Sequence, residues 1–268
     1  MRCVLLQCQP VWQDLSASRK HLASMMDAAG DLRGALVMTP EMAESGFTMH
    51  PHHACDNQSE SFAIDQARKH ECFMLHGFVH KSQRGFHNMV ALVAPDGEVM
   101  LRYIKHHHFS PAGEHKVFQG GSSISIATVG EMKISPFICY DLRFPELWRH
   151  AALAGAEIMT VSACWPQIRQ SHWRAMVIAR AVENQAYVLA CNRVGDEPTS
   201  TCVGGSLVVA PDGEVLAEGG SAAMSLVAEV DPQRVKAWRE KFPALRDLHR
   251  ELLGEIPTHT SADSSRFD

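Results

Sequence analysis

The chain has 268 residues, of which 46% are hydrophobic and 21% charged, and its formal net charge is −5. This composition is ordinary for a globular protein and excludes a collagen-like or wholly disordered chain. The mild acidity argues against a large basic surface for nucleic acid, and the lack of any apolar stretch of 18 residues argues against a membrane span.

Short apolar runs alternate with segments of helical periodicity, a pattern typical of an α/β fold. In chain order, the first half predicts a strand, a helix, a strand, a helix and two strands, at 2–8, 16–29, 35–39, 60–72, 72–79 and 87–94. The second half predicts a strand, a helix, a strand, a helix, a strand and a hairpin, at 132–138, 144–154, 157–163, 171–184, 186–192 and 204–217. Pro136 favours an edge strand or a bulge, because proline cannot donate a ladder hydrogen bond.

One segment is repeated almost letter for letter, as LVAPDGEV at 92–99 and VVAPDGEV at 208–215. An Asp-Gly pair between apolar flanks is a hairpin signal, so we expect similar hairpins in two sheets, although turn chemistry alone can produce the shared letters. No Gly/Ser linker or charge block divides the chain. We therefore predict one domain over residues 1–256 and a polar C-terminal tail at 257–268.

The eight cysteines form no CxxC pair and show no zinc-finger spacing. A chain of this length buries enough surface to need no disulfides, and its N-terminus has no apolar run long enough for a signal peptide. We therefore expect a reducing, cytoplasmic setting in which most thiols are buried and inert.

Cys139 differs from the other cysteines because it lies between an apolar strand and a helix, in ISPFICYDLRFPELWR. Such a turn exposes a nucleophile and places backbone N–H groups beside it. A buried structural cysteine is an equally good interpretation of this residue alone. A cysteine nucleophile needs a base and an oxyanion stabiliser, and the spacing of the sixteen histidines singles out none of them as the base.

Two charged residues also follow apolar strands: Glu41 in ALVMTPE and Lys105 in LRYIKHHHF. Both are expected at the carboxyl end of a sheet, where α/β proteins bind ligands. Each is singly compatible with a solvated loop charge.

Together and in this order, Glu41, Lys105 and Cys139 resemble the Glu-Lys-Cys triad of the nitrilase superfamily of carbon–nitrogen hydrolases. The runs LVMTPE, YIKHH, SPAGEHKVF, ICYDLRFPE, ARAVENQAYV and GGSLVVAPDGEV match motifs of that family in order, and the resemblance extends over about residues 2–245. It implies an α/β fold with two mixed β-sheets in a four-layer α-β-β-α sandwich. It also implies a homodimer or higher homo-oligomer, a small-molecule amide substrate, and no metal or organic cofactor.

The resemblance also implies the role of each residue. Cys139 is the nucleophile, Glu41 the general base, and Lys105 an oxyanion donor together with the backbone N–H of Tyr140. Glu114 matches a second family glutamate, which holds the lysine. The implied reaction is hydrolysis of a non-peptide amide bond through a cysteine thioester, with release of ammonia.

Tyr140 and Asp141 follow the cysteine where true nitrilases tend to have Trp-Glu, which favours an amide over a nitrile. CYDLRFPELWR and RVKAWREKFPALRD resemble the omega-amidase branch, whose substrates are 2-oxoglutaramate and the monoamides of short dicarboxylic acids. The carboxylate of such a substrate needs a cationic partner. Arg143 is the candidate, unless it pairs with Asp141 or Glu146.

Three aromatic residues are candidates for the apolar wall of the substrate site, and core packing explains each of them equally well: Phe47, Tyr140 and Trp165. An N-carbamoyl amino acid amidase or another aliphatic amidase is the alternative enzyme, and a nitrilase is less favoured. An inactive family member that binds a partner, or a histidine-rich metal-binding protein, would be a different class. His106, His107 and His108 invite the metal interpretation, but successive residues of an extended strand point to opposite faces and cannot all ligate one ion.

Overall fold

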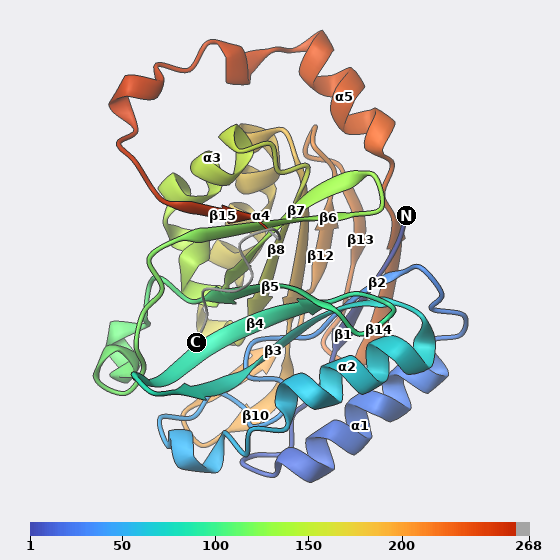
Figure 1. Ribbon diagram of the computed structural model, residues 1–268, viewed down its shortest axis with the longest axis vertical. Helices are drawn as coiled ribbons and strands as arrows, with labels where there is room; N and C mark the ends of the chain where they lie inside the picture. The colour runs from blue at the N-terminus through green and yellow to red at the C-terminus, as the bar shows by residue number, and fades with distance from the viewer. Residues whose placement is uncertain (261–268) are drawn as a thin grey trace.

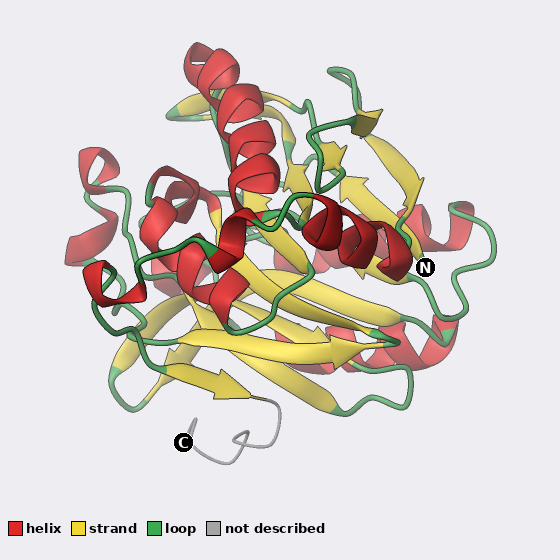
Figure 2. Ribbon diagram, turned by 90° about the horizontal axis from the view of Figure 1, so that it is seen from above, coloured by secondary structure: helices red, strands yellow, loops and turns green. Residues whose placement is uncertain are grey.

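The computed structural model describes residues 1–260 of the chain. Two mixed β-sheets face one another and helices cover their outer faces, so the layers follow the order α-β-β-α (Figures 1 and 2). The fold class predicted from the sequence is confirmed.

Within the described residues, the first sheet has six strands in the order β14-β1-β2-β3-β4-β5. Their bounds are Met224–Glu229, Arg2–Gln7, Leu36–Met38, Phe73–Ser82, Gly85–Val93 and Val99–Ile104. β1, β2 and β3 are parallel, and the remaining neighbours pair antiparallel. Of these strands, the sequence pattern did not predict β14.

The second sheet has seven strands over the same described part of the chain, in the order β13-β12-β9-β8-β7-β6-β15. Their bounds are Val215–Glu218, Leu207–Val209, Tyr187–Asn192, Ile158–Ala163, Met132–Ile138, Ile124–Val129 and Thr258–Thr260. β7, β8 and β9 are parallel. A separate antiparallel ribbon of β10 (Val194–Glu197) and β11 (Ser200–Val203) follows β9.

Helices α1 (Leu15–Ala28) and α2 (Ser59–His70) cover the first sheet, and α3 (Pro145–Leu153) and α4 (Gln170–Asn184) cover the second. Side chains of β1 show how the layers form, because successive residues of a strand point to opposite faces. Val4 and Leu6 pack in the cluster formed with α1 and α2. Cys3 and Leu5 belong to the large core that includes the facing sides of both sheets.

The described residues also contain one further α-helix and seven 3-10 turns. Helix α5 spans Pro232–Lys241, and the 3-10 turns η1, η2, η3, η4, η5, η6 and η7 span Pro51–His53, Ser110–Ala112, Glu114–Lys116, Cys139–Arg143, Gln167–Arg169, Ala244–Arg246 and Arg250–Leu252. Between α5 and β15 the chain arches outward from the sheets (Figure 1). No described helix combines the length and the apolar character that crossing a membrane requires.

The two copies of the sequence repeat form equivalent hairpins, β4–β5 in the first sheet and β12–β13 in the second. Their registers shift at the same letter of the repeat, between Leu92 and Val93 in one copy and between Val208 and Val209 in the other. The prediction of similar hairpins in two sheets is confirmed. The shared bulge means that the repeat encodes a common backbone path as well as a common turn.

β7 is an internal strand, so the prediction that Pro136 marks an edge strand or a bulge is wrong. The parallel pairing with β8 runs through Pro136, whereas the register with β6 ends at Ile134. Pro136, which has no backbone N–H, therefore lies beyond the end of the pairing with β6, in the part of β7 that pairs only with β8.

The predicted C-terminal tail begins with an ordered segment. Thr258–Thr260 forms β15, which pairs in parallel with Ile124–Ile126 of β6 at the edge of the second sheet. The rest of the predicted tail, 261–268, lies outside the described residues.

Candidate active site

Glu41 lies just beyond β2, in a tight turn whose next residue, Met42, has a φ of 45°. Its side chain is fully buried. Gly77 of β3 allows this turn to lie close, because a Cβ at position 77 would stand 3.2 Å from the Cα of Glu41 and against the carbonyl of Pro40. The backbone N–H of Ala43 also donates to the carbonyl of Gly77 (2.9 Å), so the turn is fixed to the sheet.

Cys139 begins η4 directly after β7, as the sequence predicted for a strand-to-helix turn. Its φ is 43°, in the left-handed region that non-glycine residues rarely occupy. Strain of this kind persists only where the surrounding structure holds it, and it is typical of exposed nucleophile turns.

Asp141 holds the cysteine turn and connects it to the lysine segment. Its carboxylate accepts hydrogen bonds from the backbone N–H of Ile138 (3.1 Å), the hydroxyl of Tyr103 (2.8 Å) and the backbone N–H of His107 (2.9 Å). Burial disfavours the charge of Asp141, but the hydrogen bonds of His107 and Tyr103 outweigh burial and hold its pKa below the ordinary value. Tyr103 and His107, which stand two residues before and two residues after Lys105, therefore both anchor the turn that carries the thiol.

Lys105 lies at the centre of a fully buried array of charged and polar side chains. Its Nζ donates to Oε1 of Glu41 (2.7 Å) and to Oε2 of Glu114 (2.8 Å). Nδ2 of Asn88 donates to Oε1 of the same two glutamates, at 2.7 and 2.8 Å. Burial opposes the charge of Lys105, but Glu114 and Glu41 outweigh it and raise the pKa of Lys105, which keeps the ammonium charged.

The Cys139 thiol borders this array. Burial, with Glu41 adding to it and Lys105 opposing it, raises the pKa of Cys139 well above its ordinary value. The resting thiol is therefore protonated and needs a base. Glu41 is the carboxylate that contributes to this rise in the thiol pKa, and its Oε2 accepts the backbone N–H of Cys164 (3.0 Å). The fold thus brings together the four residues that sequence motifs singled out: Glu41, Lys105, Glu114 and Cys139.

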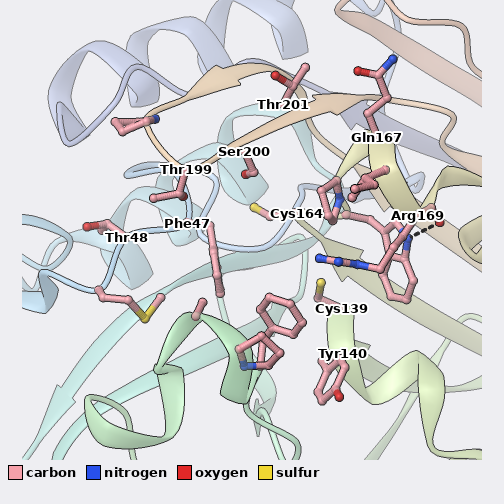
Figure 3. Close-up of a pocket in the computed structure, with 18 of the residues that line it drawn as sticks. Phe47, Thr48, Cys139, Tyr140, Cys164, Gln167, Arg169, Thr199, Ser200 and Thr201 are labelled. Carbon is pink, nitrogen blue, oxygen red and sulfur yellow. Dashed lines mark hydrogen bonds between the residues drawn. The ribbon is translucent and has the colours of Figure 1, made fainter.

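A cavity of about 870 Å³ opens beside Cys139 (Figure 3). The three residues expected as an apolar wall, Phe47, Tyr140 and Trp165, all line it, and so does Cys164. Other parts of the wall come from η2, η5 and the turn between β10 and β11.

Arg143 also lines the cavity, with its guanidinium 4.8 Å from the centre of a Trp165 ring. The alternative of an ion pair with Asp141 or Glu146 is not what the structure has. Asp141 is bound by the lysine segment, and no carboxylate of the described residues pairs with Arg143. Its hydrogen-bond partner is Nδ1 of His172, at 3.4 Å.

Sequence reasoning missed two residues of the site. Arg169 places a second guanidinium on the cavity, 5.2 Å from the centre of the Phe109 ring, and no residue of the described cavity lining is acidic. Asn88, which bridges the two glutamates, stands in the apolar run NMVALV; a buried amide in such a strand is a signal, because buried polar groups need partners. Nothing in the sequence around Arg169 distinguishes it from a surface arginine.

The three adjacent histidines separate in the structure. Nδ1 of His107 binds Asp141 (3.0 Å), while the His106 ring stacks on Tyr103 at 5.3 Å. Over residues 1–260, no group of three His, Cys, Asp or Glu side chains is arranged to hold a metal ion.

Comparison with known proteins agrees with the resemblance seen in the motifs. A family model described as carbon-nitrogen hydrolase matches residues 4–240. The omega-amidase YafV of Yersinia enterocolitica is 35% identical over 261 residues, which covers 94% of this chain and 98% of that protein. The 2-oxoglutaramate amidase of Bacillus subtilis (strain 168) is 35% identical over 195 residues, covering 72% and 75%. Among solved structures, a CN-hydrolase superfamily protein from Xanthomonas campestris, with an arsenic adduct in its active site, has a TM-score of 0.87 at 26% identity, covering 92% and 97%.

Proposed function

The chain belongs to the carbon–nitrogen hydrolase family, and on that premise we propose that it releases ammonia from a small carboxylated amide. 2-Oxoglutaramate and the monoamides of short dicarboxylic acids are the proposed substrates. Two relatives named as an omega-amidase and a 2-oxoglutaramate amidase support this class. The observation that carries it is the cavity lining, which holds Arg143 and Arg169 and, within the described residues, no acid. Guanidinium groups bind carboxylates through paired hydrogen bonds.

The first half of the proposed reaction acylates Cys139. Glu41 takes the thiol proton, and the thiolate forms a C–S bond with the amide carbon. The carbonyl oxygen becomes negative and accepts hydrogen bonds from Lys105 and from the backbone N–H of Tyr140. That N–H lies in the first turn of η4, where backbone donors have no partner within the helix. Losing one such donor typically lowers the rate by about 10²- to 10³-fold.

The second half of the reaction restores the enzyme. The C–N bond breaks, and Glu41 gives its proton to the departing ammonia. Glu41 then takes a proton from water, which attacks the thioester carbon. The C–S bond breaks, the carboxylic acid leaves, and the Glu41 proton returns to the Cys139 sulfur. Glu114 and Asn88 act as positioning residues, since their bonds to Lys105 and Glu41 keep the donor and the base in fixed places.

The substrate carboxylate is proposed to lie between the guanidinium groups of the cavity. Arg143 rests against Trp165 and Arg169 against Phe109. Stacking on aromatic rings supports both cations, and it leaves N–H groups at the guanidinium edges for the ligand.

A panel assay of ammonia release tests the proposal. 2-Oxoglutaramate and succinamate are compared with N-carbamoyl amino acids, neutral aliphatic amides and nitriles, with Cys139→Ala as the control. We expect the highest kcat/KM for the carboxylated amides and no turnover by the Cys139→Ala variant. A preference for N-carbamoyl amino acids or neutral amides would replace the proposed substrate class, and turnover by Cys139→Ala would overturn the proposed nucleophile.

A further inference from the structure

A further buried carboxylate, that of Glu197, lies close to the proposed catalytic array and has no part in the mechanism above. Glu197 ends β10, its side chain is 2% exposed, and its Oε2 pairs with Nη2 of the fully buried Arg193 at 2.9 Å. Nη1 of Arg193 also donates to the carbonyl of Gly195 (2.8 Å), which fixes the guanidinium within the β10–β11 ribbon. A buried ion pair contributes little to stability on balance, so stability is a weak explanation for this one.

Glu197 holds the loop that follows Glu41. Both of its carboxylate oxygens accept the backbone N–H of Phe47, at 3.2 and 3.3 Å. The preceding residue, Gly46, has a φ of 72°, and a Cβ there would collide with the Glu197 carboxylate and stand 2.9 Å from Trp12. Glycine at position 46 is therefore needed both for its backbone conformation and for the close approach of Glu197.

Phe47 connects this contact to the ammonium of the array. Its ring centre lies 5.4 Å from Nζ of Lys105, within the range of a cation–π interaction. The ring also lines the cavity that contains Cys139 (Figure 3). A continuous series of contacts thus runs from Glu197 through the backbone and the ring of Phe47 to Lys105.

We propose that Glu197 is a positioning residue, whose carboxylate fixes the backbone at Phe47 so that the ring keeps the Lys105 ammonium directed at the reacting carbonyl. The inference rests on the roles proposed for Lys105 and Cys139, and it does not depend on which amide is the substrate.

The charge state of Glu197 gives this contact a pH dependence. Burial raises the pKa of Glu197 to about 7, against the opposing effects of Arg193 and the Phe47 N–H and with a further increase from Glu41. Cys164 and Cys202 also face this group, and burial raises the pKa of both thiols, so they stay neutral. The carboxylate binds Arg193 and Phe47 together, whereas the neutral acid turns an O–H toward one of these donors. The positioning therefore weakens as the pH falls through about 7.

The test compares wild-type enzyme with Glu197→Gln, which keeps the size of the side chain but removes the charge. Two rates are measured over the pH range around 7: kcat for an amide that turns over, and alkylation of Cys139 by iodoacetamide. Wild-type rates should fall as the pH falls through about 7. In Glu197→Gln this inflection should be absent, and kcat above pH 7 should be about tenfold lower, as expected for a lost hydrogen bond to a charged group, with a smaller change in KM.

A double-mutant cycle tests the route through the ring. In a Phe47→Leu background, Glu197→Gln should cost little further kcat, because residues that act through one contact are not additive. Glu60→Gln is the matched control: it removes a carboxylate bound to Arg102 (2.7 and 2.8 Å), on α2 and outside the cavity lining, and should leave both pH profiles unchanged.

Three results would overturn the proposal: a Glu197→Gln enzyme that keeps the inflection, one that only loses thermal stability with an unchanged kcat, or fully additive losses with Phe47→Leu. The alkylation rate separates this inference from the proposed function. If no amide of the panel is hydrolysed, but the alkylation inflection is present in the wild type and absent in Glu197→Gln, the substrate proposal fails and the role of Glu197 stands.

Discussion

Replacing Gly77 by alanine tests whether the contact between β3 and the turn after β2 sets the position of the proposed base. Gly77 has no left-handed backbone conformation to preserve, so alanine changes only the contact. The added Cβ would lie 3.2 Å from the Cα of Glu41 and 3.2 Å from the carbonyl carbon of Pro40, and well inside contact with the carbonyl oxygen of Pro40.

The size of the effect follows from the contact. The Pro40 oxygen has to move by roughly 1 Å to reach an ordinary C···O separation of about 3.3 Å. The backbone of Gly77 is hydrogen-bonded to the turn at both ends: its N–H donates to the Thr39 hydroxyl (3.0 Å), and its carbonyl accepts the N–H of Ala43 (2.9 Å). Glu41 lies between these two contacts, so a shift of the turn moves Glu41 as well. A displacement of this size at a reacting group lowers the rate by about 100-fold, and overpacking costs about 1–3 kcal/mol of stability.

The assay combines kcat and KM for ammonia release with the free energy of unfolding in urea. Gly220→Ala is the control, because a Cβ at position 220 would meet nothing within 4 Å. We expect Gly77→Ala to lose kcat far beyond its loss of stability and Gly220→Ala to resemble the wild type. A Gly77→Ala enzyme with wild-type kcat would refute the reasoning.

Three further changes have defined outcomes. Asn88→Ala removes a donor to two charged acceptors, each such bond contributing about 1.5–3 kcal/mol, so urea unfolding and the ammonia assay should show stability and kcat falling together. Asp141→Asn should be less stable than the wild type. Because the folded-state pKa of Asp141 lies below 3.8, the stabilisation by its charge is complete above about that pH and is lost as the pH falls through the lower folded value. Thermal unfolding of both proteins as a function of pH measures this difference. Arg169→Met should lower kcat/KM about tenfold for carboxylated amides but not for neutral ones, measured by ammonia release.

The sequence predicted the residues that follow strands and carry motifs, because both signals are local. Glu41 and Lys105 stand just beyond β2 and β5 of the first sheet, and Cys139 stands just beyond β7 of the second, so each follows the carboxyl end of a strand. Asn88 was missed because its role depends on partners 47 and 26 residues away, Glu41 and Glu114. An apolar strand pattern records that an amide is present in the strand, but not which acceptors the fold brings to it.

The sequence also did not show how the strands and loops pair with one another. The run 132–138 was predicted as a strand, yet Pro136 was placed at an edge because the sequence does not show where the β6 ladder ends. The Glu197–Arg193 pair was missed for a related reason. β10 and β11 are short and partly exposed, so they carry little apolar periodicity, and the burial of Glu197 comes from the distant loop at Phe47.

The histidines illustrate how a residue type can suggest the wrong role. Histidine is the usual base for a cysteine nucleophile, but spacing singled out none of the sixteen and the family motifs implied Glu41 instead. In the structure His107 is engaged with Asp141. Tyr103 and His107 stand two residues before and two residues after Lys105, and both bind Asp141, which follows the thiol by two residues. These two contacts tie the segment that carries the ammonium to the turn that carries the thiol, while the proton transfers are proposed for Glu41, which another segment supplies.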